Sequence, residues 1–311
     1  MNLFPYAPHL GWHAVHQAID TVCDMNMNTA AGRAMRTENL VRLADAFKPN
    51  VICGMNSYLR HKFLATSVIR KAKLPDQVLF INGAEKMLEA EREQIKKLAS
   101  HAGVAHPIVL DVYAASELKE AFLPECTPGS GFHHIAPLSS IIRTIKPKKA
   151  TRHLITEWEF SKEGVAAVWN IDGAGTSLQG YIIGDVFGHV EERECPNCKL
   201  QVKRIFEVDR VQEAQAQAEI MGVLEIKVKG TKVDLAEIRE IALNTPGVIE
   251  AQVAVDKSRT RLEVRYVSNE PEKARKALEQ AYSNLEVKPK LVPTTLEKLR
   301  GDKLKFEGIK L

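Results

Sequence analysis

The sequence lacks any long apolar run. None of its 311 positions begins a stretch of 18 consecutive apolar residues, so no transmembrane helix is predicted. The N-terminal residues also lack the basic start and the apolar core of a signal peptide. We therefore expect a cytoplasmic protein that does not insert into a membrane.

Strong net charge and abundant cysteine are also missing. Lys and Arg total 43 against 39 Asp and Glu, and the resulting net charge of +4 is too small to indicate a nucleic-acid-binding protein. Five cysteines are too few and too scattered for a secreted disulfide scaffold. The composition is that of an ordinary globular protein, and the length predicts about two domains.

Helix and strand patterns alternate in the first third of the sequence. Apolar strands are predicted at 51–53, 77–81 and 107–113, with helical patterns between them. This β-α-β-α-β order predicts a mainly parallel sheet covered by helices. Since ligands bind at the carboxyl ends of such strands, we expect a site at residues 82–85 and 113–117.

The pattern changes near residue 138, where short strands begin to recur and predict an antiparallel, strand-rich subdomain. An Ala- and Gln-rich segment, 211–222, is expected to be a hinge. Residues 223–311 then show the βαββαβ order of a ferredoxin-like module. The predicted architecture is an α/β domain over 1–210, the hinge, and a small ferredoxin-like α+β domain over 223–311.

Residues at the predicted strand ends have the chemistry of a nucleotide site. Gly83 permits a close backbone approach to a planar ligand, and Tyr113 could stack on a base. Glu117 could bind a magnesium ion that bridges phosphates, while Ser116 could bond a phosphate or carboxylate oxygen. Asp185 follows another strand and could accept hydrogen bonds from ribose hydroxyls. Each of these residues taken alone is more often part of an ordinary turn.

Cysteine spacing indicates a second site. Cys195 and Cys198 form a CxxC pair, and Cys126 is followed seven residues later by His133 and then by His134. A structural zinc ion takes four tetrahedral ligands, which the three cysteines and one of the two histidines would supply. A redox dithiol is the weaker alternative, because Cys195 does not lie between a strand end and a helix start.

The order of these motifs resembles that of the adenylate-forming ligases, and most closely the phenylacetate–CoA ligase branch. The matching segments are 82–85, 111–117, 181–185 and 229–238, together with Cys126, 131–133 and the Cys195–Cys198 pair. The 82–85 segment is similar to the family's Gly-Ala-Glu motif, and 111–117 is similar to its tyrosine-to-glutamate motif. The resemblance extends over nearly the whole sequence.

This resemblance implies a two-step ligase. A carboxylic acid attacks the α-phosphate of ATP to give an acyl-adenylate, and a thiol such as coenzyme A then displaces AMP. Catalytic roles are implied for Glu117, through magnesium, and for a C-terminal lysine, either Lys303 or Lys305. The implied nucleotide contacts are Gly83, Ala84, Glu85, Tyr113, Ala114, Ser116, Asp185 and Arg210.

One family feature has no good match. The Ser/Thr/Gly-rich phosphate loop lies upstream of every matched segment, and 28–32 is a poor substitute for it. We therefore expect a separate partner subunit that carries the phosphate-loop region, and a homo-oligomer is also compatible with the sequence. The alternative is a non-catalytic relative that binds a nucleotide or an acyl-CoA, or that acts as a scaffold in a complex.

Overall fold

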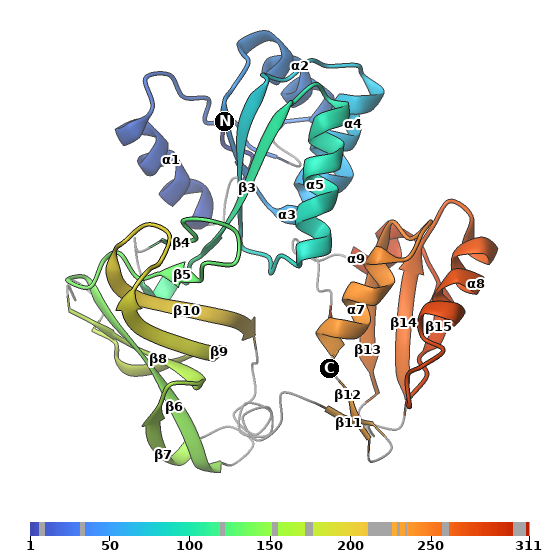
Figure 1. Cartoon of the computed structure of the whole chain (residues 1–311). Coiled ribbons are helices and arrows are strands. Elements are labelled where there is room, and N and C mark those ends of the chain that lie inside the picture. Colours follow the sequence, from blue (N-terminus) through green and yellow to red (C-terminus); the bar gives the residue numbers. More distant parts are fainter. Residues whose placement is uncertain are drawn as a thin grey trace. The chain divides into compact units, whose positions relative to one another are not determined.

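The computed structural model describes residues 1–5, 10–31, 35–118, 122–150, 155–171, 177–210, 226–228, 231–233, 235–256, 261–300 and 309–310. The chain divides into two compact units (Figure 1). The first unit comprises Met1–Met87 and Arg92–Met221, and the second comprises Leu88–Glu91 and Gly222–Leu311. No helix in the described part of the chain is long and apolar enough to cross a membrane.

The first unit contains the predicted parallel sheet. Its strand order is β1-β2-β3-β4, in which the first three strands are parallel and β4 runs antiparallel to β3. The strands are β1 (Val51–Gly54), β2 (Gln77–Gly83), β3 (His106–Tyr113) and β4 (Leu123–Pro124). The mainly parallel sheet expected from the alternating pattern is thus confirmed.

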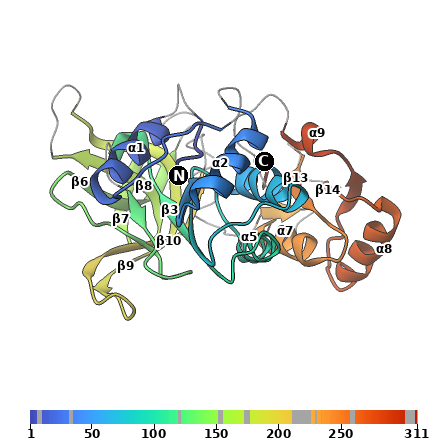
Figure 2. The same ribbon diagram turned by 90° about the horizontal axis from the view of Figure 1, so that it is seen from above.

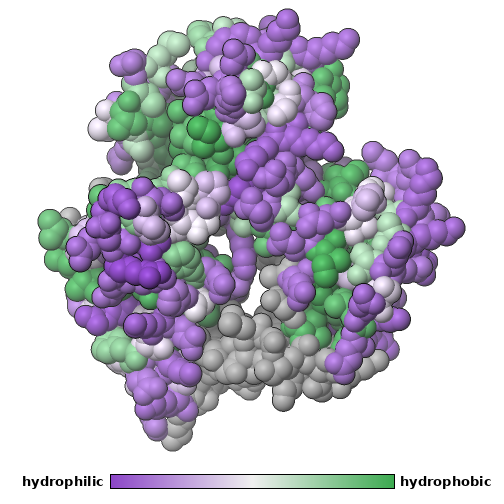
Figure 3. All heavy atoms as spheres, viewed as in Figure 1, coloured by the Kyte–Doolittle hydropathy of each residue, from purple (hydrophilic) through white to green (hydrophobic). Residues whose placement is uncertain are grey.

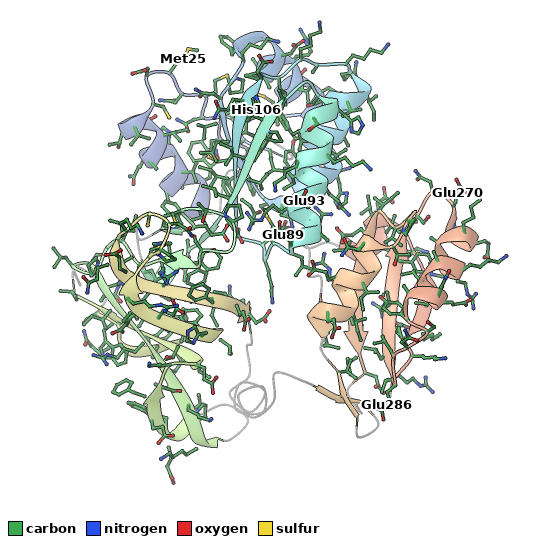
Figure 4. All side chains as sticks on the ribbon, in the orientation of Figure 1. Met25, Glu89, Glu93, His106, Glu270 and Glu286 are labelled. Carbon is green, nitrogen blue, oxygen red and sulfur yellow. The ribbon has the colours of Figure 1, made fainter. Side chains whose placement is uncertain are left out.

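Helices surround this sheet. They are α1 (Leu10–Val22), α2 (Thr37–Phe47), α3 (Asn56–Tyr58), the π-helix η1 (Leu59–Leu64), α4 (Ala65–Ile69) and α5 (Glu89–His101). Figures 1 and 2 both place α1 and α5 on opposite sides of β3. Apolar residues of the strands and helices, such as Leu40, Phe63 and Phe80, form one buried core. In Figure 4, His106 marks the amino end of β3 and Glu93 lies in the first half of α5.

A six-stranded antiparallel sheet completes the first unit and confirms the predicted strand-rich subdomain. Its order is β5-β10-β9-β8-β6-β7. The strands are β5 (Phe132–His133), β6 (Ser140–Ala150), β7 (Ile155–Ser161), β8 (Gly164–Asn170), β9 (Gln179–Glu194) and β10 (Gln201–Arg210). Leu118 and Leu123 join Phe187 and Ile205 in one apolar cluster, which packs the two sheets of this unit together.

The second unit contains two further sheets. One is a hairpin of β11 (Ile226–Val228) and β12 (Thr231–Val233), and the other has the order β15-β14-β13-β16. Its remaining elements are α7 (Leu235–Asn244), β13 (Glu250–Val255), β14 (Leu262–Val267), α8 (Pro271–Ala281), β15 (Lys290–Pro293), α9 (Leu296–Arg300) and β16 (Ile309–Lys310). Hydrophilic side chains cover much of the visible face of each unit (Figure 3).

The observed order of this second unit differs from the ferredoxin-like prediction. The strand predicted to begin the module, of which 226–228 is described, pairs with β12 rather than with the four-stranded sheet. The backbone N–H and C=O groups of β11 pair with those of β12, which lies only a few residues further along the chain. Consecutive strands pair in this way more often than distant ones. The expected hinge, 211–222, lies outside the described residues, and the predicted domain boundary stays a prediction.

Candidate functional site

Three predicted nucleotide contacts meet where β3, β9 and β10 come together. The hydroxyl of Tyr113 donates a hydrogen bond to Oδ2 of Asp185 over 2.6 Å, although 72 positions separate the two residues. Arg210 is the register partner of Asp185 on the neighbouring strand, and its Nε lies 3.9 Å from Oδ1. The structure therefore brings Tyr113, Asp185 and Arg210 into one cluster at the carboxyl end of the parallel sheet.

The surroundings of Tyr113 keep its hydroxyl protonated. Its ring contacts those of Phe132 and Phe187, with centroid distances of 5.9 and 5.6 Å. Burial, followed by the negative charge of Asp185, raises the pKa of the Tyr113 hydroxyl. Because the hydroxyl can only donate to a carboxylate, Asp185 is held as an acceptor at the end of the sheet.

Three other predicted contacts follow directly after β3. Ala114 and Ser116 are exposed, and Glu117 is half-buried in the short 3₁₀ helix Ser116–Leu118. The carbonyl of Glu117 accepts a hydrogen bond from Nδ2 of Asn170 over 3.2 Å, which ties this turn to β8. Glu117 thus follows shortly after Tyr113 in the sequence, in a turn whose backbone is held by Asn170. Its carboxylate is a suitable ligand for magnesium.

The 83–85 segment has structural contacts of its own. A Cβ atom on Gly83 would lie 3.2 Å from Cζ of Phe4, so a larger residue would press against that ring. The Glu85 carboxylate accepts hydrogen bonds from the backbone N–H and the hydroxyl of Ser57 at 2.7 and 2.8 Å. Ala84 has a left-handed φ of 67°. These contacts account for the glycine at position 83 and for the carboxylate of Glu85 without a ligand.

Sequence reasoning missed a buried polar network beneath these strand ends. Nδ2 of Asn82 donates to Oδ1 of Asp111 over 2.6 Å, and burial raises the pKa of Asp111 to about 7. Arg92 of α5 pairs with Glu125 at 3.0 Å, and both side chains are almost fully buried. The signal was an aspartate inside the apolar strand 107–113, since a charged residue there must have partners.

The predicted zinc ligands also converge. One ligand atom from each of Cys126, His133, Cys195 and Cys198 lies within 4.8 Å of the other three. The Sγ atoms of Cys126 and Cys195 are 3.7 Å apart, and Sγ of Cys198 lies 3.4 Å from Nε2 of His133. A tetrahedral ion with Zn–S bonds of about 2.3 Å places its sulfur ligands about 3.8 Å apart. The spacing and the donor types therefore fit a structural zinc ion.

The histidine of this cluster is His133. Its Nδ1 lies 3.1 Å from the carbonyl oxygen of Pro124 and 2.9 Å from that of Gly131. Because carbonyls only accept, Nδ1 carries the hydrogen and Nε2 keeps the lone pair that a metal needs. The neighbouring His134 is buried elsewhere, with Nε2 3.2 Å from the Ser140 hydroxyl.

The electrostatics of the cluster also favour a cation. A hydrogen bond from the Cys198 backbone lowers the pKa of Cys195 to about 6. The Leu200 backbone lowers the pKa of Cys198, but lost hydration and the adjacent Cys195 and Cys126 sulfurs outweigh it and raise the pKa overall. Since neighbouring thiolates disfavour one another, a positive ion between Cys195 and Cys198 would favour the ionised forms of both.

The predicted C-terminal lysine cannot be placed in this way. Lys303 and its alternative Lys305 lie outside the described residues. Both therefore remain sequence-based predictions.

Neither a family model nor a curated protein sequence matches the chain. Among solved structures, a 2-hydroxyisobutyryl-CoA ligase in the postadenylation state with 2-HIB-AMP matches with a TM-score of 0.68 and 15% identity, over 99% of this chain and 64% of that one. An anthranilate CoA ligase with anthranoyl-AMP matches with a TM-score of 0.52 and 12% identity, over 86% and 49%. A McyG A-PCP protein with phenylalanyl-adenylate matches with a TM-score of 0.57 and 10% identity, over 96% of this chain and 48% of that one.

The chain spans between 48% and 65% of the length of these and related solved proteins. At such low identities the likeness concerns the fold and not the activity. The order of the motifs in the sequence and the arrangement of the strands in the structure both indicate the same fold. The chain has the fold of the adenylate-forming acyl- and aryl-CoA ligases.

Proposed function

We propose that the protein is a subunit or short form of an adenylate-forming ligase. It would activate a carboxylic acid with ATP to an acyl-adenylate and pass the acyl group to a thiol such as coenzyme A. The observation that carries this proposal is the contact between Tyr113 and Asp185, beside Arg210, at the carboxyl end of the sheet. Solved proteins of the same fold hold acyl- or aryl-adenylates.

In this proposal the cluster binds the nucleoside part of ATP. The ring of Tyr113 offers a face on which adenine stacks. Asp185 is a buried acceptor for the two ribose hydroxyls, and such charge-assisted hydrogen bonds are about twice as strong as neutral ones. Arg210 adds a positive charge next to this carboxylate on the exposed side of the strand.

The chemistry takes place at the α-phosphate. A carboxylate oxygen of the acid forms a bond to phosphorus while the bond to pyrophosphate breaks. A thiolate sulfur then attacks the acyl carbon, and AMP leaves with the electron pair of the broken C–O bond. Glu117 would hold magnesium, which neutralises phosphate charge when bound, and Lys303 or Lys305 would supply a further cation.

The cysteine cluster has a different part in this proposal. Cys126, His133, Cys195 and Cys198 would hold zinc with all four tetrahedral positions filled. A closed site leaves no position for substrate, so these residues would fasten the 126–133 segment to the 195–198 turn and take no part in the reaction.

A separate partner subunit would supply the phosphate-loop region. A non-catalytic nucleotide- or acyl-CoA-binding relative is the second candidate function. It is favoured by the contacts of Phe4 with Gly83 and of Glu85 with Ser57, which occupy two expected nucleotide contacts with protein groups.

Carboxylate-dependent exchange of labelled pyrophosphate into ATP tests the proposal. The probes are 2-hydroxyisobutyrate, anthranilate and phenylacetate with Mg²⁺, each with the protein alone and with any chain that copurifies with it. The ligase proposal expects exchange that Glu117→Gln abolishes. AMP binding without exchange under every condition would favour the non-catalytic relative.

A further inference from the structure

The two clusters of the first unit share one short segment of chain, 123–133, which begins with β4 and ends with β5. β4 pairs with β3 directly at Tyr113, whose register partner is Leu123. β5 contains only Phe132 and His133, and its two side chains serve different clusters. Phe132 packs against the ring of Tyr113, while His133 points Nε2 at Cys198.

The orientation of the metal ligand His133 depends on the same 123–133 segment. Nδ1 of His133 hydrogen-bonds to the carbonyl oxygen of Pro124, which lies in β4 next to the partner of Tyr113. This hydrogen bond therefore links the ring orientation of His133 to the position of β4. A hydrogen-bonded second partner of this kind fixes the ring orientation of metal-binding histidines.

Glu125 attaches the 123–133 segment to the parallel sheet. Its Oε2 accepts a hydrogen bond from the backbone N–H of Asp111 at 2.9 Å and from Arg92 at 3.0 Å. Its Oε1 accepts from the backbone N–H of Gly129 at 2.9 Å, in the loop that follows Cys126. One buried carboxylate thus joins the metal-ligand loop to β3 two residues before Tyr113.

We propose that metal binding at the cysteine cluster and nucleotide binding at Tyr113 are coupled through this 123–133 segment. Phe132 is the contact that transmits the coupling, and Glu125 is a positioning residue. A bound ion would hold the imidazole of His133 at Cys198, and this would fix the adjacent Phe132 against the Tyr113 ring. This inference rests on the proposed nucleotide site. The coupling must be reciprocal, because linkage between two binding equilibria is symmetric.

Calorimetric titration with AMP tests the coupling on the full-length chain. We expect AMP to bind at least about fivefold more weakly to the zinc-stripped protein than to the zinc-loaded protein, as is typical of coupled sites. Chelator competition should show zinc affinity rising by the same factor when AMP is present. Phe132→Leu should bring both factors close to one.

Phe187→Leu is the matched control, because Phe187 contacts the same tyrosine ring from β9 rather than from the 123–133 segment. It should weaken AMP binding to both forms and leave their ratio unchanged. If stripping unfolds the protein, as seen by circular dichroism, chelator competition with and without AMP decides alone. Equal AMP affinities, or a zinc affinity independent of AMP, would overturn the coupling alone. A loaded protein that does not bind AMP would overturn the proposed nucleotide site as well.

Discussion

The hydroxyl of Tyr113 is hydrogen-bonded to Oδ2 of Asp185 over 2.6 Å, and this contact joins the end of the parallel sheet to the antiparallel sheet. Asp185 is only 6% exposed, so its carboxylate has given up most of its hydration. A buried carboxylate accepts hydrogen bonds strongly, which makes this pair the natural place to test nucleotide binding.

Asp185→Ala should weaken AMP binding about 10- to 100-fold, because hydrogen bonds to a charged group contribute about 1.5–3 kcal/mol. Tyr113→Phe keeps the ring and should change the affinity less than Asp185→Ala does. Isothermal titration calorimetry measures both. Asp76→Asn, at an exposed position before β2, is the control and should bind like the wild type. A Tyr113→Phe loss as large as that of Asp185→Ala would mean that the hydroxyl, not the ring, carries binding.

The cysteine cluster should hold one zinc ion per chain after purification without chelator. Cys195→Ser or His133→Ala should remove most of it, because each takes away one of four ligands. His134→Gln should retain it, since the ring of His134 lies against Ser140. Metal analysis by mass spectrometry and the thiolate charge-transfer bands of a cobalt-substituted protein measure the difference. Zinc loss in His134→Gln but not in His133→Ala would contradict the assignment.

The sequence predicted the positions of both clusters but not their internal geometry. Motif spacing was enough to select Cys126, Cys195 and Cys198, because cysteines that bind one metal ion recur at typical spacings in a sequence. It could not separate His133 from His134, since adjacent residues have the same chemistry. The structure decides between them, because Nε2 of His133 lies 3.4 Å from Sγ of Cys198, whereas His134 follows β5 and lies against Ser140.

Other features depended on long-range packing. Phe4 reaches Gly83 from the N-terminal segment, and Glu85 reaches Ser57 at the start of α3. Neither pairing has a local sequence pattern. The βαββαβ prediction for the second unit had a correct succession of helices and strands in its later part, but strand succession does not determine which strands pair. The hairpin of β11 with β12 shows that difference.

The contribution of Asp111 to the stability of the first unit should fall as pH rises from about 4 to 7. Burial raises the pKa of Asp111 to about 7 in the folded state, whereas an unfolded aspartate has a pKa of about 3.9. The folded state therefore holds the proton more tightly, and ionising the group costs stability across this interval. Chemical denaturation at a series of pH values measures the slope.

Asp111→Asn should remove this dependence on pH. The amide oxygen can still accept from Asn82, and its NH₂ group replaces the protonated carboxyl. At pH 8 the variant should be more stable than the wild type, by up to about 4 kcal/mol at 1.36 kcal/mol per pKa unit. Asp76→Asn serves as the exposed control and should follow the wild-type profile. Parallel profiles for Asp111→Asn and the wild type would show that Asp111 is ionised when buried.

Two glycines of the metal-ligand loop provide a matched pair of substitutions. Gly129 and Gly131 both have left-handed backbones, with φ of 72° and 82°. A Cβ atom on Gly129 would meet nothing within 4 Å, whereas one on Gly131 would lie 2.6 Å from the Phe206 ring. Gly129→Ala should therefore cost only the backbone strain of about 1–2 kcal/mol.

Gly131→Ala should cost more, because the methyl group must also displace Phe206, whose ring stacks near His189 and under the guanidinium of Arg204. It should also weaken zinc binding, since the Gly131 carbonyl accepts from Nδ1 of His133. Urea denaturation of the zinc-loaded protein and chelator competition measure the two effects. Combining Gly131→Ala with Phe206→Leu should recover part of the loss by making room for the methyl group. Equal stability and zinc affinity for Gly129→Ala and Gly131→Ala would contradict this prediction. The contact of Gly131 with Phe206 of β10 would then not determine the geometry of the metal site.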